Sequence, residues 1–418
     1  MPTNNATVFN AAGPSIGPSN LGVTINTDNA VGDSFGRVRT SGTSNRFDCE
    51  FIYDKQPLLI DEVTAGGGTA THNGNPRDVT LSVVDANNGT EAALYSHYDI
   101  PYTPGNSQLV DITGTLDNAG IGGGTAFVFL RTSISGSVTE TTYEQANWSG
   151  ATSGVDWADS FILSMDFQSL KVGRIRFALV QNGVAVPIKS IHNDNVRSTG
   201  YWQRPSLPAY WRIYNDATYT YMEMGYGDEG NAIGIRYRIA VNASATMRAI
   251  CSTVKSEGGV ELLDLPGYPF SASNGTTAVT VSTTLIPVLS IRVGANINSL
   301  TNRGIHIPIS YGIVGSNPMY YKVLYRPTLT GASWTAVDST YSGIEYDVSA
   351  SAFSGGVVVD EGHFATGRNT FSDTAGILNR LILSQGRTGT SDILTLAAVR
   401  TGSSDSTTYG SLKWKEIR

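Results

Sequence analysis

The chain has 418 residues, of which 40% are apolar and only 15% are charged, and its formal net charge is −7. This acidic balance excludes broad electrostatic attachment to nucleic acid, which requires clustered Lys and Arg. No apolar run is long enough to span a bilayer, and the first residues lack the basic and apolar parts of a signal peptide. We therefore expect a protein that is made in a cytoplasm and binds neither nucleic acid nor membrane.

Residues 1–45 are expected to form an extended arm. The segment is rich in Asn, Thr, Ser and Gly, and Gly13-Pro14 and Gly17-Pro18 interrupt any regular period. Its few apolar residues cannot bury enough surface to offset the entropy lost on ordering. We expect a neighbouring subunit to hold this arm in an assembly.

From about residue 46 onward, short apolar or alternating runs are separated by turn clusters, which is typical of a β-sandwich or barrel. We predict an all-β chain with two consecutive β-sandwich or jelly-roll-like domains, residues 46–262 and 263–418, divided in the Gly-rich stretch 258–275. The predicted strands are 79–84, 107–116, 126–130, 161–167, 174–180, 233–241, 248–254, 277–282, 284–293, 305–314, 320–325, 343–348, 357–360, 378–383 and 392–399.

Turn residues refine this pattern. Asn182-Gly183 lies between two apolar runs and predicts a two-residue hairpin, because both central residues need positive φ. In the run 235–241 the odd positions are mostly apolar, so Arg236 and Arg238 are expected on the other face of a half-buried strand. The glycine triplets at 66–68 and 122–124 are interpreted as hairpin tips.

The sequence offers no ligand set for a metal or a cofactor. The five histidines stand singly, without the spacing of a zinc site. The stretches that begin at Asp85 and Asp228 are oxygen-rich, but turns use the same residues, and we favour turns over Ca²⁺ loops. Cys49 and Cys251 are expected to be free thiols, since a disulfide is disfavoured in cytosolic synthesis.

Catalysis is not expected either. Asp61, Glu62, Asp156 and Asp159 are possible members of a carboxylate pair for sugar cleavage, but solvated turn residues account for them better. We therefore expect a protein that is not an enzyme.

An aromatic and cationic cluster at residues 201–212 is the best candidate for a contact site. Trp, Tyr and Arg dominate interface hot spots, and planar rings also stack on sugars. Aromatic residues equally fill a sandwich core, so three alternatives stay open: core, subunit interface or glycan site. The candidate residues are Tyr201, Trp202, Arg204, Tyr210, Trp211 and Arg212.

Several motifs resemble those of a family of tailed-phage virion structural proteins. The resemblance departs from the family at Ser169 and Lys171, where a Trp and a Gly are expected. The motifs, in the family's order, are DSFGRVRTS at 33–41, LKVGRIRF at 170–177, CSTVKSEGG at 251–259, PVLSIR at 287–292 and LKWKEIR at 412–418.

This resemblance implies a non-enzymatic virion component, located in the virion and assembled from symmetric copies of itself and neighbouring virion proteins. Its position in the particle stays open between head surface, collar and tail. The alternative is a carbohydrate- or receptor-binding module of a tail or head appendage, with a host-surface glycan as partner and Trp202, Trp211 and nearby tyrosines as the platform.

Overall fold

The computed structural model describes residues 42–84, 88–116, 124–134, 136–149, 155–239, 243–365, 370–372 and 381–417. These residues form antiparallel β-sheets and two single-turn 3₁₀ helices, η1 (Gln145–Asn147) and η2 (Leu262–Asp264). The predicted all-β class is confirmed. None of the described residues belongs to a helix that could cross a membrane. The predicted arm, residues 1–45, lies outside the described residues up to position 41.

The first domain is a sandwich of two sheets. Its eight-stranded sheet contains, in spatial order, β11 (Val184–Ile191), β10 (Ile175–Gln181), β9 (Phe161–Phe167), β6 (Gln108–Thr115), β15 (Ala245–Ser256), β4 (Asp78–Val83) and β3 (Thr69–Asn73), with β1 (Ser44–Glu50) also paired to β15. Its seven-stranded sheet contains β2 (Ile60–Ala65), β5 (Glu91–Ser96), β12 (Ala209–Asn215), β13 (Thr220–Gly227), β14 (Ala232–Ile239), β7 (Thr125–Ile134) and β8 (Ser137–Glu144).

The second domain is a smaller sandwich. One sheet contains β16 (Tyr268–Ser273), β30 (Ser406–Ile417), β21 (Ile305–Gly315) and β28 (Thr370–Ser372), with β17 (Val279–Val281) also on β30. The other contains β24 (Thr335–Ala336), β25 (Ile344–Asp347), β18 (Ile286–Val293), β29 (Ile393–Arg400), β22 (Met319–Tyr325) and β27 (Val357–Phe364). Two small ribbons pair β19 (Asn296–Ile297) with β20 (Leu300–Thr301) and β23 (Thr328–Thr330) with β26 (Ala352–Ser354).

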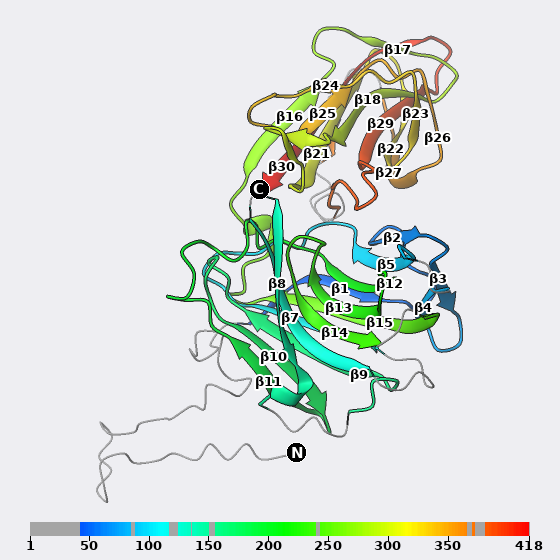
Figure 1. The fold of residues 1–418 in the computed structure, drawn as a ribbon. Helices are drawn as coiled ribbons and strands as arrows, with labels where there is room; N and C mark the ends of the chain where they lie inside the picture. Colours follow the sequence, from blue (N-terminus) through cyan, green and yellow to red (C-terminus); the bar gives the residue numbers. More distant parts are fainter. Residues whose placement is uncertain are drawn as a thin grey trace, which may run out of the picture.

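Each domain has its own apolar core between its two sheets. In the first core Trp211 on β12 packs edge-on against Phe51, with ring centroids 5.6 Å apart. Trp414 on β30 is fully buried in the second core. Figure 1 shows the second domain seated on one end of the first, beside β2, β5 and β12. The domains therefore meet across a limited contact area rather than through a shared core.

The alternation of apolar residues and the residues at turns explain the β10–β11 hairpin and the two faces of β14. The Asn182-Gly183 hairpin is confirmed: both residues have positive φ, 51° and 76°, and Gln181 pairs with Val184 across the turn. On β14, Ile235 faces the core while Arg236 lies on the opposite face, as its alternation predicts. That face is not open to solvent along its whole length, however, because Arg236 is buried and Arg238 is half-buried.

The glycines at 66–68 were expected at a hairpin tip, and this was wrong. They connect β2 of one sheet to β3 of the other, and β2 pairs with β5 instead of β3. A Cβ on Gly68 would lie 1.9 Å from the carbonyl oxygen of Glu91, so the corner needs glycine to pass close to β5. Of the triplet 122–124, only Gly124 lies among the described residues.

The two cysteines are free. Across the β1–β15 pair, Cys49 faces Ser252 while Cys251 faces Glu50. Facing residues share one side of a sheet and successive residues alternate, so the two thiols point to opposite faces. The predicted strand at 378–383 is partly outside the described residues, and Leu383 makes only an isolated bridge to His306.

Candidate functional site

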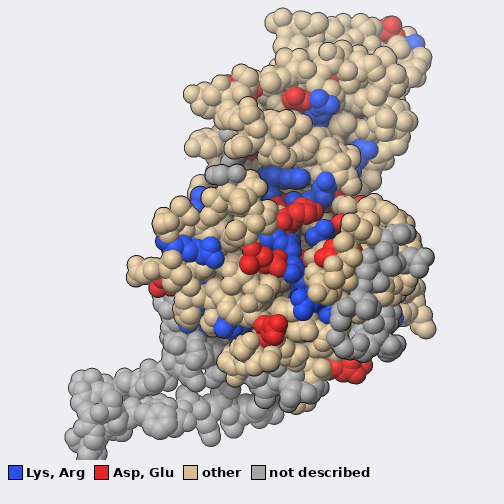
Figure 2. All heavy atoms as spheres, viewed as in Figure 1, with Lys and Arg blue, Asp and Glu red and all other residues tan. Residues whose placement is uncertain are grey.

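Ionisable side chains from both domains meet where the two sandwiches touch. We call this cluster the interdomain joint. The first domain contributes Asp61 on β2, His97 and Asp99 directly after β5, and Arg204 and Asp228 from loops beside β12 and β13; the second contributes Arg326 directly after β22, and Arg387 and Asp392 before β29. In Figure 2 charged side chains gather in a band at the junction and over the first domain, whereas the visible surface of the second domain is mostly uncharged.

His97 connects one carboxylate from each domain. Its Nδ1 lies 2.6 Å from Oδ1 of Asp61, and its Nε2 lies 2.8 Å from Oδ2 of Asp392. Burial alone would lower the pKa of His97, but hydrogen bonds to Asp392 and Asp61 outweigh burial and raise this pKa above its ordinary value. The imidazolium form satisfies both carboxylates at once, because only that form has two N–H donors.

Asp392 is the most enclosed acceptor of the joint. Its Oδ1 accepts a hydrogen bond from Nε of Arg326 at 2.5 Å, and its Oδ2 accepts one from the backbone N–H of Ser384 at 2.9 Å. Burial would raise the pKa of Asp392, but His97 and Arg326 hold it below its ordinary value. Arg326 also donates across the junction from Nη1 to the carbonyl oxygen of Pro57, 2.9 Å away.

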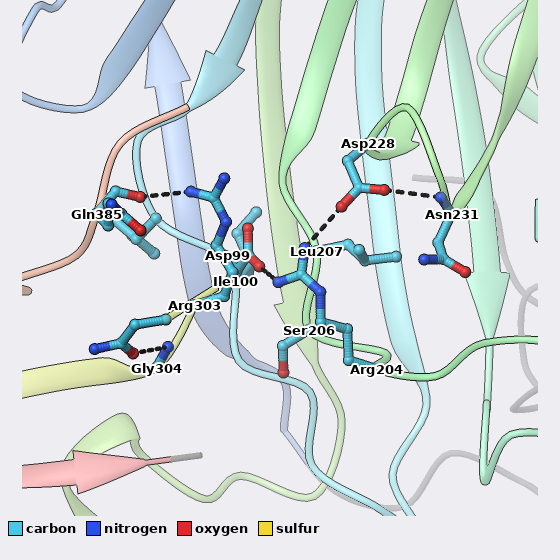
Figure 3. A network of polar contacts seen from close by, with 12 residues as sticks. Asp99, Ile100, Arg204, Ser206, Leu207, Asp228, Asn231, Arg303, Gly304 and Gln385 are labelled. Carbon is cyan, nitrogen blue, oxygen red and sulfur yellow. Dashed lines mark hydrogen bonds and ion pairs between the residues drawn. The ribbon is translucent and has the colours of Figure 1, made fainter. Parts of the chain in front are cut away.

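A second group of the joint centres on two arginines. Figure 3 shows Arg204 between Asp99 and Asp228, and its Nη2 lies 2.7 Å from Oδ2 of Asp228. Arg387 reaches over from the second domain and pairs with the same two carboxylates, Asp99 and Asp228. Burial, together with the neighbouring charges of Arg387 and Arg303, lowers the pKa of Arg204 to about 10, although Asp228 opposes this shift.

A close approach of backbone to side chain completes the joint. The backbone N–H of Arg387 donates to Oδ2 of Asp61 at 2.6 Å. A Cβ on Gly386 would lie 2.7 Å from that same oxygen and 3.0 Å from Cε1 of His97. Only glycine leaves room for the loop at this distance, so the sequence at position 386 sets how closely the domains approach.

A cavity of about 300 Å³ opens beside His97. Its charged lining residues are already matched: Lys55 pairs with Glu62, Asp61 with His97, and Arg326 with the adjacent Asp392. Both ring nitrogens of His97 also face carboxylates, so neither is free to accept a proton from a nucleophile. The chemistry of the joint is therefore ion pairing between domains.

A second buried network, the Glu223 network, covers the outer face of the seven-stranded sheet. Glu223 is completely buried and accepts hydrogen bonds from Arg236 at 2.6 Å and from Arg131 at 3.1 Å. Burial would raise the pKa of Glu223, but the charges of Arg236, Arg131 and Arg212 hold it well below its ordinary range. The hydroxyl groups of Tyr210 and Tyr214 donate to the same carboxylate.

The candidate residues of the aromatic cluster at 201–212 lie in different parts of the first domain. Tyr201, Trp202, Tyr210 and Trp211 are each at most 1% exposed, so of the three alternatives burial favours a structural role, and neither Trp202 nor Trp211 presents a ring on which a glycan could stack. The rings of Tyr201, Trp202 and Trp211 belong to the core of the first sandwich. Tyr210, which precedes Trp211 on β12, lies on the opposite face of the sheet, where its hydroxyl group reaches Glu223. Arg204 belongs to the interdomain joint.

Arg212 pairs with both carboxylate oxygens of Glu91, at 2.8 and 3.0 Å. Its guanidinium also lies over the ring of Tyr214, 4.2 Å from the centroid. The pair lies on the same outer face of the sheet as the Glu223 network, where long side chains cover one another. Sequence reasoning named Arg212 only as a candidate contact residue and did not identify Glu91 as its partner.

Sequence reasoning missed the most connected residues of the joint. His97 and Asp392 are 295 positions apart, and each stands in an ordinary strand boundary. Asp61 was considered only as a member of a carboxylate pair, and in the structure it holds His97 instead. A lone histidine between two short apolar runs was the one available signal.

The Asp228 stretch is a turn, as predicted. Oδ1 of Asp228 accepts hydrogen bonds from the backbone N–H groups of Gly230 and Asn231, at 3.0 and 2.8 Å, and its Oδ2 faces Arg204 and Arg387. Two guanidinium groups occupy the side from which a cation would bind. Asp85 lies outside the described residues. Within the described ranges, no group of His, Cys, Asp and Glu side chains is arranged to hold a metal ion.

No family model matches the sequence, and no curated protein matches it. Among solved structures, the chain is similar to the exoplasmic/lumenal domain of VIP36 in a Ca²⁺/Man3GlcNAc-bound form, with 10% identity, 53% of this chain and 92% of that chain covered, and a TM-score of 0.20. It is also similar to the lectin UEA-II in complex with galactose, with 11% identity, 51% and 100% covered, and a TM-score of 0.20. A protein of unknown function from Shewanella oneidensis MR-1 matches at 10% identity, 54% and 92% covered, and a TM-score of 0.21. At such TM-scores these likenesses assign neither a site nor a ligand to this chain.

Proposed function

We propose that this chain is a non-enzymatic structural subunit of a tailed-phage virion, which contributes a rigid pair of β-sandwich domains to the particle. The observation that carries the proposal is the interdomain joint. His97 and Arg387 each contact a carboxylate from the other domain, so the joint fixes one domain against the other. A subunit that builds a regular assembly requires such a fixed shape, because its contact surfaces must keep their relative positions.

The residues of the family-like motifs support the same proposal by their positions. Gly173, within LKVGRIRF, would place a Cβ 1.7 Å from the carbonyl oxygen of Gln168, so the tight turn before β10 needs glycine. Gly258, within CSTVKSEGG, has a φ of 95° and lies in the turn two residues after the end of β15. These positions determine the fold, as expected of motifs shared by proteins of common architecture.

A non-enzymatic role also agrees with the chemistry of the buried charges. In the interdomain joint and the Glu223 network, the carboxylates and arginines are held in ion pairs. A general acid or base needs a proton that can be transferred to a substrate, and groups locked in mutual pairs do not offer one. The carbohydrate-binding alternative has lost the exposed Trp202 and Trp211 on which it depended.

The proposal is tested on particles. Antibodies raised against the purified chain should label intact virions from a lysate of the bacterium that produces them, and the chain should band with the particles in a density gradient. Unlabelled particles, with the chain left in the soluble fraction, would contradict the virion role. A glycan array probed with the purified chain examines the alternative, and specific binding there would favour it.

A further inference from the structure

Strand β8 leaves one long edge of the seven-stranded sheet open. Within the described part of the chain it pairs only with β7, and seven of its eight residues, all except Tyr143, are exposed. Ile134 and Ser137 close the β7–β8 hairpin across two residues, so this pair exchanges backbone hydrogen bonds. The bonded pairs then alternate along the ladder. The N–H and C=O groups of Val138, Glu140, Thr142 and Glu144 consequently point away from β7.

The open edge has few of the features that prevent edge-to-edge pairing. Natural edge strands are protected by lysine, proline or a β-bulge. Strand β11, at the end of the other sheet, has Pro187 and Lys189 and a bulge beside Phe177. Strand β8 has none of these features, and its pairing with β7 shows no register shift. Among the described residues, none of its four outward N–H groups donates to a backbone carbonyl oxygen.

The edge carries two carboxylates, Glu140 and Glu144, and one of them is paired. Glu140 pairs with Arg131 and Arg236, which belong to the Glu223 network behind it. The remaining side chains of the strand are mainly hydroxyl groups, in the sequence SVTETTYE. An arriving strand therefore meets little repulsion in a register that opposes neither glutamate to another carboxylate.

We propose that β8 is the contact through which two copies of this chain pair antiparallel, about a two-fold axis at Thr141. The inference rests on the proposed assembly function and names one of its contacts. Residues that face each other across an antiparallel pair lie on the same side of the sheet, and successive residues of a strand alternate between its two sides. In a two-fold pair of β8 strands, each residue can therefore face only a residue that is an even number of positions away in the sequence.

The sequence of β8 favours one register. With the axis at Thr141, that residue faces its own copy, Thr139 faces Tyr143, and Glu140 faces Thr142. Threonine pairs and aromatic with β-branched pairs are favourable across strands. An axis at Glu140 would oppose Glu140 to its own copy, and an axis at Thr142 would oppose Glu140 to Glu144. Like charges facing each other disfavour both, and an axis nearer either end of the strand would pair fewer of its residues, so the register at Thr141 is favoured. It forms about eight backbone hydrogen bonds.

A disulfide measures this register directly. Thr141 and its copy form a pair without mutual backbone hydrogen bonds, whose Cα atoms lie about 4.5 Å apart, within disulfide range. We expect T141C to give a covalent dimer under mild oxidation. In T139C the two cysteines are offset by four residues, roughly 13 Å along the strands, and should not cross-link. Wild-type protein, with Cys49 buried, is the background control.

Charge exchange separates loss of pairing from loss of folding. T141D and T141K place like charges across the axis, and each should weaken self-association roughly tenfold or more in sedimentation, with unchanged dichroism. A mixture of the two should restore the dimer, since Asp then faces Lys. T139D, which faces Tyr143, is the matched control and should dimerise like wild type.

A wild-type chain that stays monomeric, or cross-linking that is equal for T141C and T139C, would overturn the proposal. If wild type is monomeric but T141D blocks entry into particles, the edge receives another virion protein instead of a second copy. Particle labelling tests the proposed function independently. If particles are labelled but β8 does not pair, the virion role stands and the β8 contact is rejected. If the chain dimerises through β8 but is absent from particles, the contact stands and the virion role is rejected.

Discussion

Nε2 of His97 lies 2.8 Å from Oδ2 of Asp392, so an imidazole of the first domain and a carboxylate of the second form a direct contact across the junction. Both side chains are almost completely enclosed, at 4% and 1% exposure. The contact depends on the charge of His97. A neutral imidazole has one N–H and would turn a lone pair toward one of its two carboxylates.

The stability of the two-domain chain should therefore decrease at alkaline pH. The pKa of His97 is raised above 6.5, its ordinary value, so the stabilisation is fully present below about pH 6.5 and is lost as the pH rises through the folded-state pKa. Calorimetry of wild type between pH 6 and 9, roughly the window of this titration, should show the melting temperature falling. H97Q should be less stable at pH 6, by about 1.5 to 3 kcal/mol, and should lack this pH dependence. H192Q, at an exposed position, should retain it, and a pH-dependent H97Q would contradict the assignment.

A single methyl group at position 386 should force the domains apart. A Cβ there would lie 2.7 Å from Oδ2 of Asp61, closer than the contact allows. We expect G386A to destabilise the chain by about 1 to 3 kcal/mol and to increase the radius of gyration in small-angle scattering. In G402A the new Cβ meets its nearest neighbour, Cδ of Pro318, at an ordinary 3.8 Å, so this variant should match wild type in both measurements. A G386A chain with unchanged scattering and melting would show that the loop yields at no cost.

Removing the charge of Glu223 should be far more damaging than removing that of Glu345. E223Q leaves Arg131 and Arg236 without their shared buried counter-charge, and we expect a loss of about 3 to 5 kcal/mol in the free energy of unfolding. Glu345 forms a partly exposed pair with Arg292, at 30% and 35% exposure, and E345Q should cost less than about 1 kcal/mol. Denaturant titration at neutral pH measures both, and similar losses would mean that the Glu223 network is not the stronger element.

The Glu223 network also predicts the acid limb of stability. Because the pKa of Glu223 is lowered in the folded state, its contribution is fully present above 4.5, the ordinary value, and is lost as the pH falls through the folded-state pKa. Wild type should therefore lose more stability than E223Q as the pH falls from about 5 to about 2.

The β10–β11 hairpin should not accept a β-branched residue at position 183. Gly183 has a φ of 76°, where valine would add about 1 to 3 kcal/mol of strain. We expect G183V to lower the melting temperature. N182G leaves positive φ accessible at both turn positions and should behave nearly like wild type, so equal effects of the two variants would contradict the turn assignment.

Local pattern was enough to predict much of the fold, but little of the site. The Asn182-Gly183 turn and the alternation of β14 depend on neighbours in sequence, and both could be read from the chain. The partners of Arg236 could not, because Glu140 lies 96 positions earlier and reaches it only after β7 has paired with β8 and β14. For the same reason the burial of Trp202 depends on the packing of two sheets, and composition alone could not distinguish it from an exposed ring.

The interdomain joint also constrains how this protein can change by recombination. A gene exchange that replaced only the second domain would remove Arg326, Arg387 and Asp392 together. His97 and Asp99 would keep only their partners in the first domain, Asp61 and Arg204. An incoming domain would have to carry the matching set at matching positions, with a glycine where Gly386 stands. The two sandwiches are therefore expected to be inherited as one unit, despite having separate cores.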